Sequence, residues 1–177
     1  MRHQTKTFVE RFLDHSKIKN ANVLEVGSLD VNGNILDLFK DMQYTGVDMR
    51  EGRNVTKVLN AHDLVAEYGS ESFDLVLCFD MLEHDDAFWV SIEQMRSVLK
   101  PGGYLLLGMP SRNCPYHEHP SDYWRIMGPA MTDVFLKDYE DVYLDIQCDN
   151  QNVNNGAEDE VYGWGRKPDE DKSFVVV

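Results

Sequence analysis

The chain has few cysteines and no long apolar run. Its three cysteines, Cys78, Cys114 and Cys148, are widely spaced and form no C-x-x-C pair. This spacing favours free thiols in a reducing compartment over a disulfide framework. No segment has the length and apolar character of a signal peptide or a membrane span. We therefore expect a cytoplasmic protein that does not associate with membranes.

Basic side chains are also scarce. The sequence has 17 Lys and Arg against 31 Asp and Glu, which gives a formal net charge of −14. A chain this acidic repels a phosphate backbone unless a local basic patch intervenes, and no cluster of Lys and Arg is present. Nucleic acid is therefore disfavoured as a partner.

Internal repeats and low-complexity tracts are absent as well. The length of 177 residues and the hydrophobic fraction of 42% are typical of one globular domain with a full core. A homo-oligomer is compatible with this composition.

The glycine pattern of nicotinamide-cofactor sites is missing from the most informative segment. Val23–Gly33 reads as a short buried strand, a glycine turn and the start of a helix. The motif G-x-G-x-x-G, counted from Gly27, needs glycine where Leu29 and Asn32 stand. Glu25 would also repel a pyrophosphate, but it suits a ligand that carries an ammonium or sulfonium charge.

A second acid stands where a ribose-binding residue is expected. Gln43–Val47 predicts a strand that ends in Asp48, twenty-one residues after Gly27. An acid at the carboxyl end of the next strand can accept hydrogen bonds from both ribose hydroxyls. The thioether of the neighbouring Met49 suits the face of an adenine ring. Together with Glu25, these residues predict a cationic ligand that contains a ribose.

The remaining segments continue the alternation of strands and helices. Phe73–Phe79 is an apolar run with Asp80 at its exit, and Asp85–Leu99 has the apolar periodicity of a helix. The stretch from 101 to 109 turns through Pro-Gly-Gly into another strand. Strands that alternate with helices predict a parallel sheet covered on both faces.

In this order and spacing, the segments from Val23 to Pro168 resemble the class I S-adenosylmethionine-dependent methyltransferases, and in particular the small methyltransferase-domain proteins. The resemblance implies an α/β fold with a Rossmann-like, doubly wound, mostly parallel seven-stranded sheet and a C-terminal antiparallel hairpin (142–146 with 160–166). It implies one domain over 1–177. Its parts are an N-terminal helix (1–20), a cofactor-binding half (21–110), an acceptor loop with the closing hairpin (111–168) and a tail (169–177). The implied cofactor is S-adenosylmethionine.

The resemblance also implies roles for individual residues. Glu25 holds the amino end of the methionine moiety, and Gly27 and Ser28 border that moiety. Ala61 and His62 line the adenine. His62 is equally well explained as an exposed loop histidine.

Three further features complete the expected site. Asp80 is expected near the transferable methyl group. The apolar stripe that includes Phe8 and Phe12 predicts a leading helix that either packs across the sheet edge or covers the cofactor. The segment 119–125 is expected to form part of the acceptor pocket. A structural alternative, compatible with that role, has Tyr123 and Trp124 in the core and Arg125 paired with Asp122.

His84 and His119 are the candidate general bases for an acceptor hydroxyl or amine. His84 has a structural alternative, which is to cap the helix that follows it. The loop Cys114–His119 contains possible zinc ligands, but no second Cys or His cluster completes a tetrahedral site. We therefore expect no metal site.

The function predicted from these observations is methyl transfer from S-adenosylmethionine to an O, N or C nucleophile of a small-molecule or sugar-type acceptor. The sequence lacks the Asp/Asn-Pro-Pro-Tyr tetrapeptide by which amino-directed DNA methyltransferases of this fold are recognised. The alternative is an S-adenosylmethionine-binding module, or a non-catalytic partner subunit, that transfers no methyl group.

Overall fold

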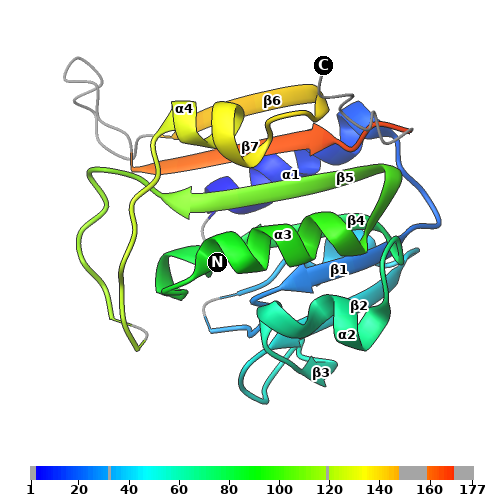
Figure 1. The fold of residues 1–177 in the computed structure, drawn as a ribbon, viewed down its shortest axis with the longest axis horizontal. Helices are drawn as coiled ribbons and strands as arrows, with labels where there is room; N and C mark the ends of the chain where they lie inside the picture. The colour runs from blue at the N-terminus through cyan, green and yellow to red at the C-terminus, as the bar shows by residue number, and fades with distance from the viewer. Residues whose placement is uncertain (1–2, 32, 119, 148–158, 170–177) are drawn as a thin grey trace, which may run out of the picture.

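The sheet dominates the structure, a computed structural model that describes residues 3–31, 33–118, 120–147 and 159–169. Seven strands are ordered β3-β2-β1-β4-β5-β7-β6 (Figure 1). Neighbours from β3 to β5 are parallel, whereas β7 is antiparallel to both β5 and β6. The strands are β1 (Asn22–Val26), β2 (Gln43–Asp48), β3 (Lys57–Val58), β4 (Phe73–Phe79), β5 (Leu99–Pro110), β6 (Glu140–Gln147) and β7 (Glu160–Arg166).

Helices and short turns of helix connect these strands. They are α1 (His3–Ser16), η1 (Leu36–Phe39), η2 (Ala61–Asp63), α2 (Leu64–Tyr68), η3 (Leu82–His84), α3 (Phe88–Val98), α4 (Gly128–Ala130) and η4 (Met131–Phe135). The predicted sheet and its antiparallel closing pair are therefore confirmed. None of the helices among the described residues combines the length and apolar character needed to cross a membrane.

The core lies on both faces of the sheet because successive strand residues point to opposite sides. In β1, Val23 belongs to one apolar cluster and Leu24 to the other, and Leu106 and Leu105 of β5 are divided in the same way. Burial on both faces explains why these strands read as continuous apolar runs rather than as alternating ones.

Helix α1 covers one face of the sheet. Phe8 stacks on Tyr162, with ring centroids 5.1 Å apart, and Phe12 contacts the rings of Tyr104 and Trp164. The predicted leading helix is confirmed, but it packs on the face near β5 and β7 rather than across the edge of the sheet (Figure 1).

The opposite face is covered by α2, α3 and the α4–η4 segment. Ile92, Met95 and Val98 of α3 are buried there at helical spacing, and Met131 and Phe135 of η4 extend the same cluster. The predicted helix from Asp85 is shorter at its amino end. The Asp85 carboxylate accepts a hydrogen bond from the Ala87 backbone N–H, which places the start of α3 at Phe88.

The prediction that a helix follows the glycine turn is wrong. Only the single 3-10 turn η1 forms there, with Ile35 and Phe39 as its buried apolar residues. Asp30 accepts hydrogen bonds from the Gly33 backbone N–H and the Asn34 side chain, and Asn34 accepts one from the Leu36 N–H. These side-chain bonds compete with the backbone ladder that a helix requires. His119 and residues 170–177 of the predicted tail lie outside the described residues.

Candidate active site

The candidate site is a cavity at the carboxyl ends of the parallel strands. Gly27, Asp48 and Asp80 directly follow or end β1, β2 and β4, and all three line the same cavity of about 910 Å³. Parallel strands bring their carboxyl ends to one edge of the sheet, so residues far apart in the sequence meet there. The cavity is lined by Val26, Gly27, Leu29, Val31, Val47, Asp48, Met49, Arg50, Leu59, Asn60, Ala61, His62, Asp80, Met81, His84, Asp85, Asp86, Glu118, Pro120 and Tyr123.

Gly27 forms the turn at the floor of this cavity. Its φ of +79° is a conformation that favours glycine, and its backbone N–H donates to the Val47 carbonyl at 2.9 Å. A Cβ atom at this position would lie 2.7 Å from the Cβ of Met81. The turn thus brings bare backbone up to the cavity, as the sequence predicted.

Leu29 takes the place of the second glycine of the dinucleotide pattern. Its side chain lines the cavity, and its Cδ1 would lie only 2.2 Å from a Cβ atom on Gly52. Gly52 therefore leaves the room that the larger leucine needs. This compensation lies twenty-three residues away in the sequence, so the motif itself gave no sign of it.

Asp48 is fixed at the wall of the cavity by the backbone around it. Its carboxylate accepts hydrogen bonds from the Leu29 N–H at 3.4 Å and the Arg50 N–H at 3.0 Å. Met49 is 70% exposed and lines the cavity beside it. Asp48 and Met49 are thus placed together where the sequence predicted a ribose and an adenine.

Ala61 and His62 of η2 also line the cavity. Asn60 caps this segment by accepting a hydrogen bond from the His62 N–H. The His62 imidazole lies 3.1 Å from the Asp85 carboxylate, so it is a held side chain rather than a free loop histidine.

Glu25 and Ser28 are buried behind the cavity instead of lining it. Glu25 is 4% exposed and accepts a hydrogen bond from the Tyr44 hydroxyl at 2.5 Å. The Ser28 hydroxyl donates to the Asn54 carbonyl at 3.4 Å. Both side chains support the turn from its inner side, and their contact with a methyl donor stays a prediction.

Burial is the main reason that the pKa of Glu25 is raised from 4.5 to about 7. The Tyr44 hydrogen bond lowers this pKa, and the charge of Asp30 raises it. A carboxyl whose pKa is higher in the folded state stabilises the fold below its unfolded pKa. That contribution is lost as the pH rises through the folded pKa.

We therefore expect the free energy of unfolding to decrease between about pH 4.5 and pH 8, with Glu25 contributing about 3 kcal/mol at most to the decrease. Glu25→Gln should flatten this part of the curve and be at least as stable as the natural chain at pH 8. Urea denaturation at several pH values measures the difference. An unchanged pH dependence in the variant would show that Glu25 titrates normally.

The end of β4 carries a second group of polar side chains. Asp80, with a φ of +50°, is followed by η3, which contains Glu83 and His84. Glu83 is fully buried, and burial, together with the charge of Asp80, raises its pKa from 4.5 to about 8. The Nδ1 atom of His84 lies 2.5 Å from the Ser121 carbonyl oxygen.

The interpretation of His84 as a helix cap is wrong. The N-cap residue of α3 is Ala87, which has no side-chain cap, while the His84 ring faces the Ser121 carbonyl of the loop after β5 and lines the cavity. His84 therefore remains a candidate base at the acceptor end of the cavity. His119, the other candidate base, lies outside the described residues.

The loop after β5 closes this end of the cavity. Asp122 pairs with Arg125, with a separation of 2.5 Å between the Arg125 Nη1 and an Asp122 oxygen, as the sequence predicted. The guanidinium is the main reason that the pKa of Asp122 lies well below its usual range. Trp124 donates to the Asp85 carbonyl, and Tyr123 reaches the cavity.

The sequence interpretation missed that this loop approaches η3. His117 lies beside Glu83 and His84, with the His84 and His117 ring centroids 5.2 Å apart. No spacing within the loop predicts this meeting, because Glu83 and His117 are thirty-four residues apart. The one available signal was an acid followed by a histidine at the exit of an apolar strand.

Comparison with known proteins agrees with this geometry. A family model described as the methyltransferase domain matches residues 1–141. The chain therefore belongs to the methyltransferase-domain family and is an S-adenosylmethionine-dependent methyltransferase of class I. A search of curated proteins found no significant match.

Solved structures share the fold at low sequence identity. A S-adenosylmethionine-dependent methyltransferase from Archaeoglobus fulgidus superimposes with a TM-score of 0.73 and 15% identity, over 94% of this chain and 95% of that one. The 1,6-didemethyltoxoflavin-N1-methyltransferase of Burkholderia thailandensis, with its substrate and S-adenosylhomocysteine bound, gives 0.68 and 17%, over 94% and 78%. The [4+2]-cyclase SpnF gives 0.68 and 13%, over 92% and 80%.

Proposed function

We propose that the protein transfers the methyl group of S-adenosylmethionine to a small-molecule acceptor bound in the same cavity. The main support is the continuity of the cavity, which runs from Asp48 and Met49 to His84 and Tyr123. A volume of about 910 Å³ lies within the range of small-molecule sites. One end therefore suits the donor, and the other leaves space for an acceptor next to the end of β4.

The charges around the cavity fit this donor. Five lining residues are acidic (Asp48, Asp80, Asp85, Asp86 and Glu118), and Arg50 is the basic side chain among them. A wall of this sign favours a sulfonium cation over an anionic dinucleotide. Asp48 would hold the ribose, and Met49, Ala61 and His62 would surround the adenine.

The residues of the chain would act by positioning the donor and the acceptor. The sulfonium is a good leaving group, so the protein has to align the acceptor in line with the carbon–sulfur bond and exclude water. Gly27 lets the backbone approach the donor, while Asp80 and Met81 border the place where the methyl group would lie. His84 is the candidate for taking a proton from the acceptor.

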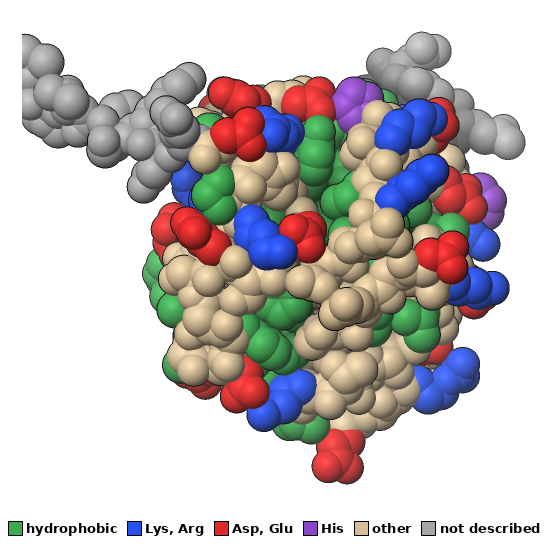
Figure 2. Space-filling view, turned by 90° about the vertical axis from the view of Figure 1, so that its right-hand side faces the viewer, with side chains coloured by type: hydrophobic (Ala, Val, Ile, Leu, Met, Phe, Trp, Pro, Cys, Tyr) green, Lys and Arg blue, Asp and Glu red, His purple; other side chains and the backbone are tan. Residues whose placement is uncertain are grey.

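A nucleic-acid acceptor remains disfavoured on charge. On the face shown in Figure 2, Lys and Arg side chains are interspersed with Asp and Glu and do not gather into a patch. The net charge of −14 points the same way. The similarity to the B. thailandensis enzyme, whose structure contains a small heterocyclic substrate, supports a small acceptor by analogy.

The rival function is a binding module without methyl transfer. The fold does not decide between them, because a [4+2]-cyclase has the same fold. Calorimetry with S-adenosylmethionine, S-adenosylhomocysteine and NAD tests the donor site first, and we expect micromolar binding of the two sulfur ligands and none of NAD. Release of S-adenosylhomocysteine with any member of an acceptor panel would then exclude the module. Binding of NAD alone would overturn the proposal.

A further inference from the structure

Glu83 is a buried carboxylate for which the proposed methyl transfer gives no role. Its side chain is 0% exposed, and neither of its oxygens has a hydrogen-bond partner among the described residues. A buried carboxylate without hydrogen bonds is costly, and such a group in a native fold calls for a specific explanation. The two imidazoles that face it, those of His84 and His117, offer one.

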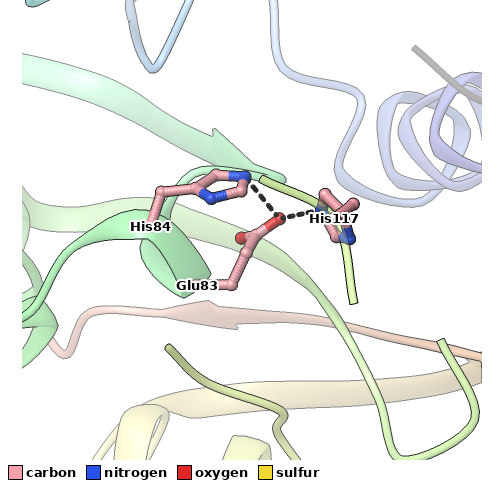
Figure 3. Close-up of side chains that lie close together, drawn as sticks. All are labelled: Glu83, His84 and His117. Atoms are coloured by element: carbon pink, nitrogen blue, oxygen red, sulfur yellow. Dashed lines mark ion pairs between the residues drawn. The ribbon is translucent and has the colours of Figure 1, made fainter. Parts of the chain in front are cut away.

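Both imidazoles point a ring nitrogen at the same carboxylate oxygen. The Oε1 atom of Glu83 lies 3.5 Å from the Nε2 of His84 and 3.6 Å from the Nε2 of His117 (Figure 3). All three atoms lie within 4.8 Å of one another. Ligand atoms around a tetrahedral zinc ion, with bonds of about 2.0–2.1 Å, are roughly 3.3 Å apart. Two of the three separations are close to that value.

The outer nitrogens of the two rings are held by acceptors. The Nδ1 of His84 faces the Ser121 carbonyl at 2.5 Å, and the Nδ1 of His117 faces the Pro115 carbonyl at 3.2 Å. A carbonyl oxygen only accepts hydrogen bonds, so Nδ1 carries the proton in each ring. In the neutral imidazoles the Nε2 lone pairs are therefore directed at Glu83. This is the tautomer and orientation of metal-binding histidines, whose other nitrogen donates to a carbonyl or a carboxylate.

We propose that Glu83, His84 and His117 bind a divalent transition-metal ion through the Glu83 carboxylate and the two Nε2 atoms. Two imidazoles and one carboxylate suit zinc, iron or manganese rather than calcium. This proposal replaces the sequence-based expectation of no metal site. That expectation considered only the loop around Cys114 and not its approach to η3.

The position of the site gives the ion access to the acceptor. Three protein ligands leave at least one coordination position open, as in catalytic zinc sites. His84 lines the cavity beside Asp80, Glu118 and Tyr123, so the open position lies toward the acceptor end.

This placement deepens the proposed function, on which it rests, by favouring an acceptor hydroxyl and by giving the ion the activating role that His84 would otherwise have as a base. Coordination lowers the pKa of a bound hydroxyl, which then loses its proton to solvent. The acceptor oxygen forms a bond to the methyl carbon as the carbon–sulfur bond breaks, and the electron pair of that bond returns to sulfur. The products are a methyl ether and neutral S-adenosylhomocysteine. An amine acceptor would need no such ion.

Metal binding is tested on the full chain after removal of metals with a chelator. Zn²⁺ is titrated by calorimetry, and Co²⁺ is added as a probe whose visible absorption reports its ligands. We expect one equivalent to bind and Glu83→Gln and His117→Ala each to weaken binding at least tenfold. His15→Ala, which removes an exposed histidine of α1, and Cys114→Ser, which removes a thiol near the site, should bind as the natural chain does.

Glu83→Gln replaces the buried carboxyl by an amide of nearly the same size, so thermal unfolding should show a folded variant. Failure of the stripped chain to bind Zn²⁺ or Co²⁺, or equal binding by Glu83→Gln, would overturn the metal site. Calorimetry with S-adenosylhomocysteine on the same samples separates the two proposals. Retained donor binding without metal binding would overturn only the metal site. Methyl transfer to a hydroxyl that persists in chelator would overturn its role toward the acceptor.

Discussion

Replacing Asp48 by alanine is expected to weaken binding of S-adenosylhomocysteine roughly 10- to 100-fold. The Asp48 carboxylate lines the cavity, where two ribose hydroxyls would donate to it, and hydrogen bonds to a charged group contribute about 1.5–3 kcal/mol. The same carboxylate accepts the Leu29 and Arg50 N–H groups, so its loss also loosens the turn. Calorimetry at one fixed salt concentration measures the effect.

Two control variants separate these contributions. Asp48→Asn keeps an oxygen acceptor for the backbone and removes the charge, so we expect an intermediate affinity. Asp37→Ala removes an exposed carboxylate that pairs only weakly with Lys40, at 3.4 Å, and should bind normally. If the Asp48→Ala variant binds S-adenosylhomocysteine as tightly as the natural chain does, Asp48 is not part of the donor site.

The Gly27→Ala variant is expected to lose roughly 2–4 kcal/mol of stability and at least a factor of ten in donor affinity. A φ of +79° is unfavourable for alanine, and the new Cβ would lie 2.7 Å from the Cβ of Met81. Relief of the clash requires Met81 or the turn to move, and both line the cavity. Urea denaturation and calorimetry measure the two losses.

Gly33 provides a matched control, because its φ is +102° but, apart from its chain neighbours, no atom of the described residues lies within 4 Å of a Cβ at that position. Gly33→Ala should therefore show only the conformational cost of about 1–2 kcal/mol and keep its donor affinity. Equal effects of the two substitutions would mean that the contact between Gly27 and Met81 has no special importance.

The donor side of the site was largely predictable from the sequence. Gly27, Asp48 and Asp80 each stand at the exit of a short apolar strand, and a parallel sheet necessarily brings such exits together. The adjacent residues Met49, Ala61 and His62 line the cavity as predicted. Glu25 and Ser28 do not line the cavity, and their contact with the donor stays a prediction, because the pattern of a strand and turn does not say which side chain the neighbouring strand covers. Tyr44 of β2 covers Glu25.

The acceptor side of the site was less predictable from the sequence. His84 was recognised as a candidate, but Ser121 and His117, which contact or face it, come from the loop after β5, whose path no local pattern fixes. The same limitation applies to Leu29, whose fit depends on Gly52.

The sequence by itself determined the order of strands and helices, the parallel sheet with its antiparallel closing pair, and a cationic donor site at the strand ends. These features depend on hydrophobic periodicity, strand exits and charge, which are local signals. Only the tertiary structure decided that the glycine turn leads into a single 3-10 turn, that α1 covers a face of the sheet, and that His117 meets Glu83 and His84. Those outcomes depend on side-chain contacts between segments distant in the chain, where packing and hydrogen bonding override local preference.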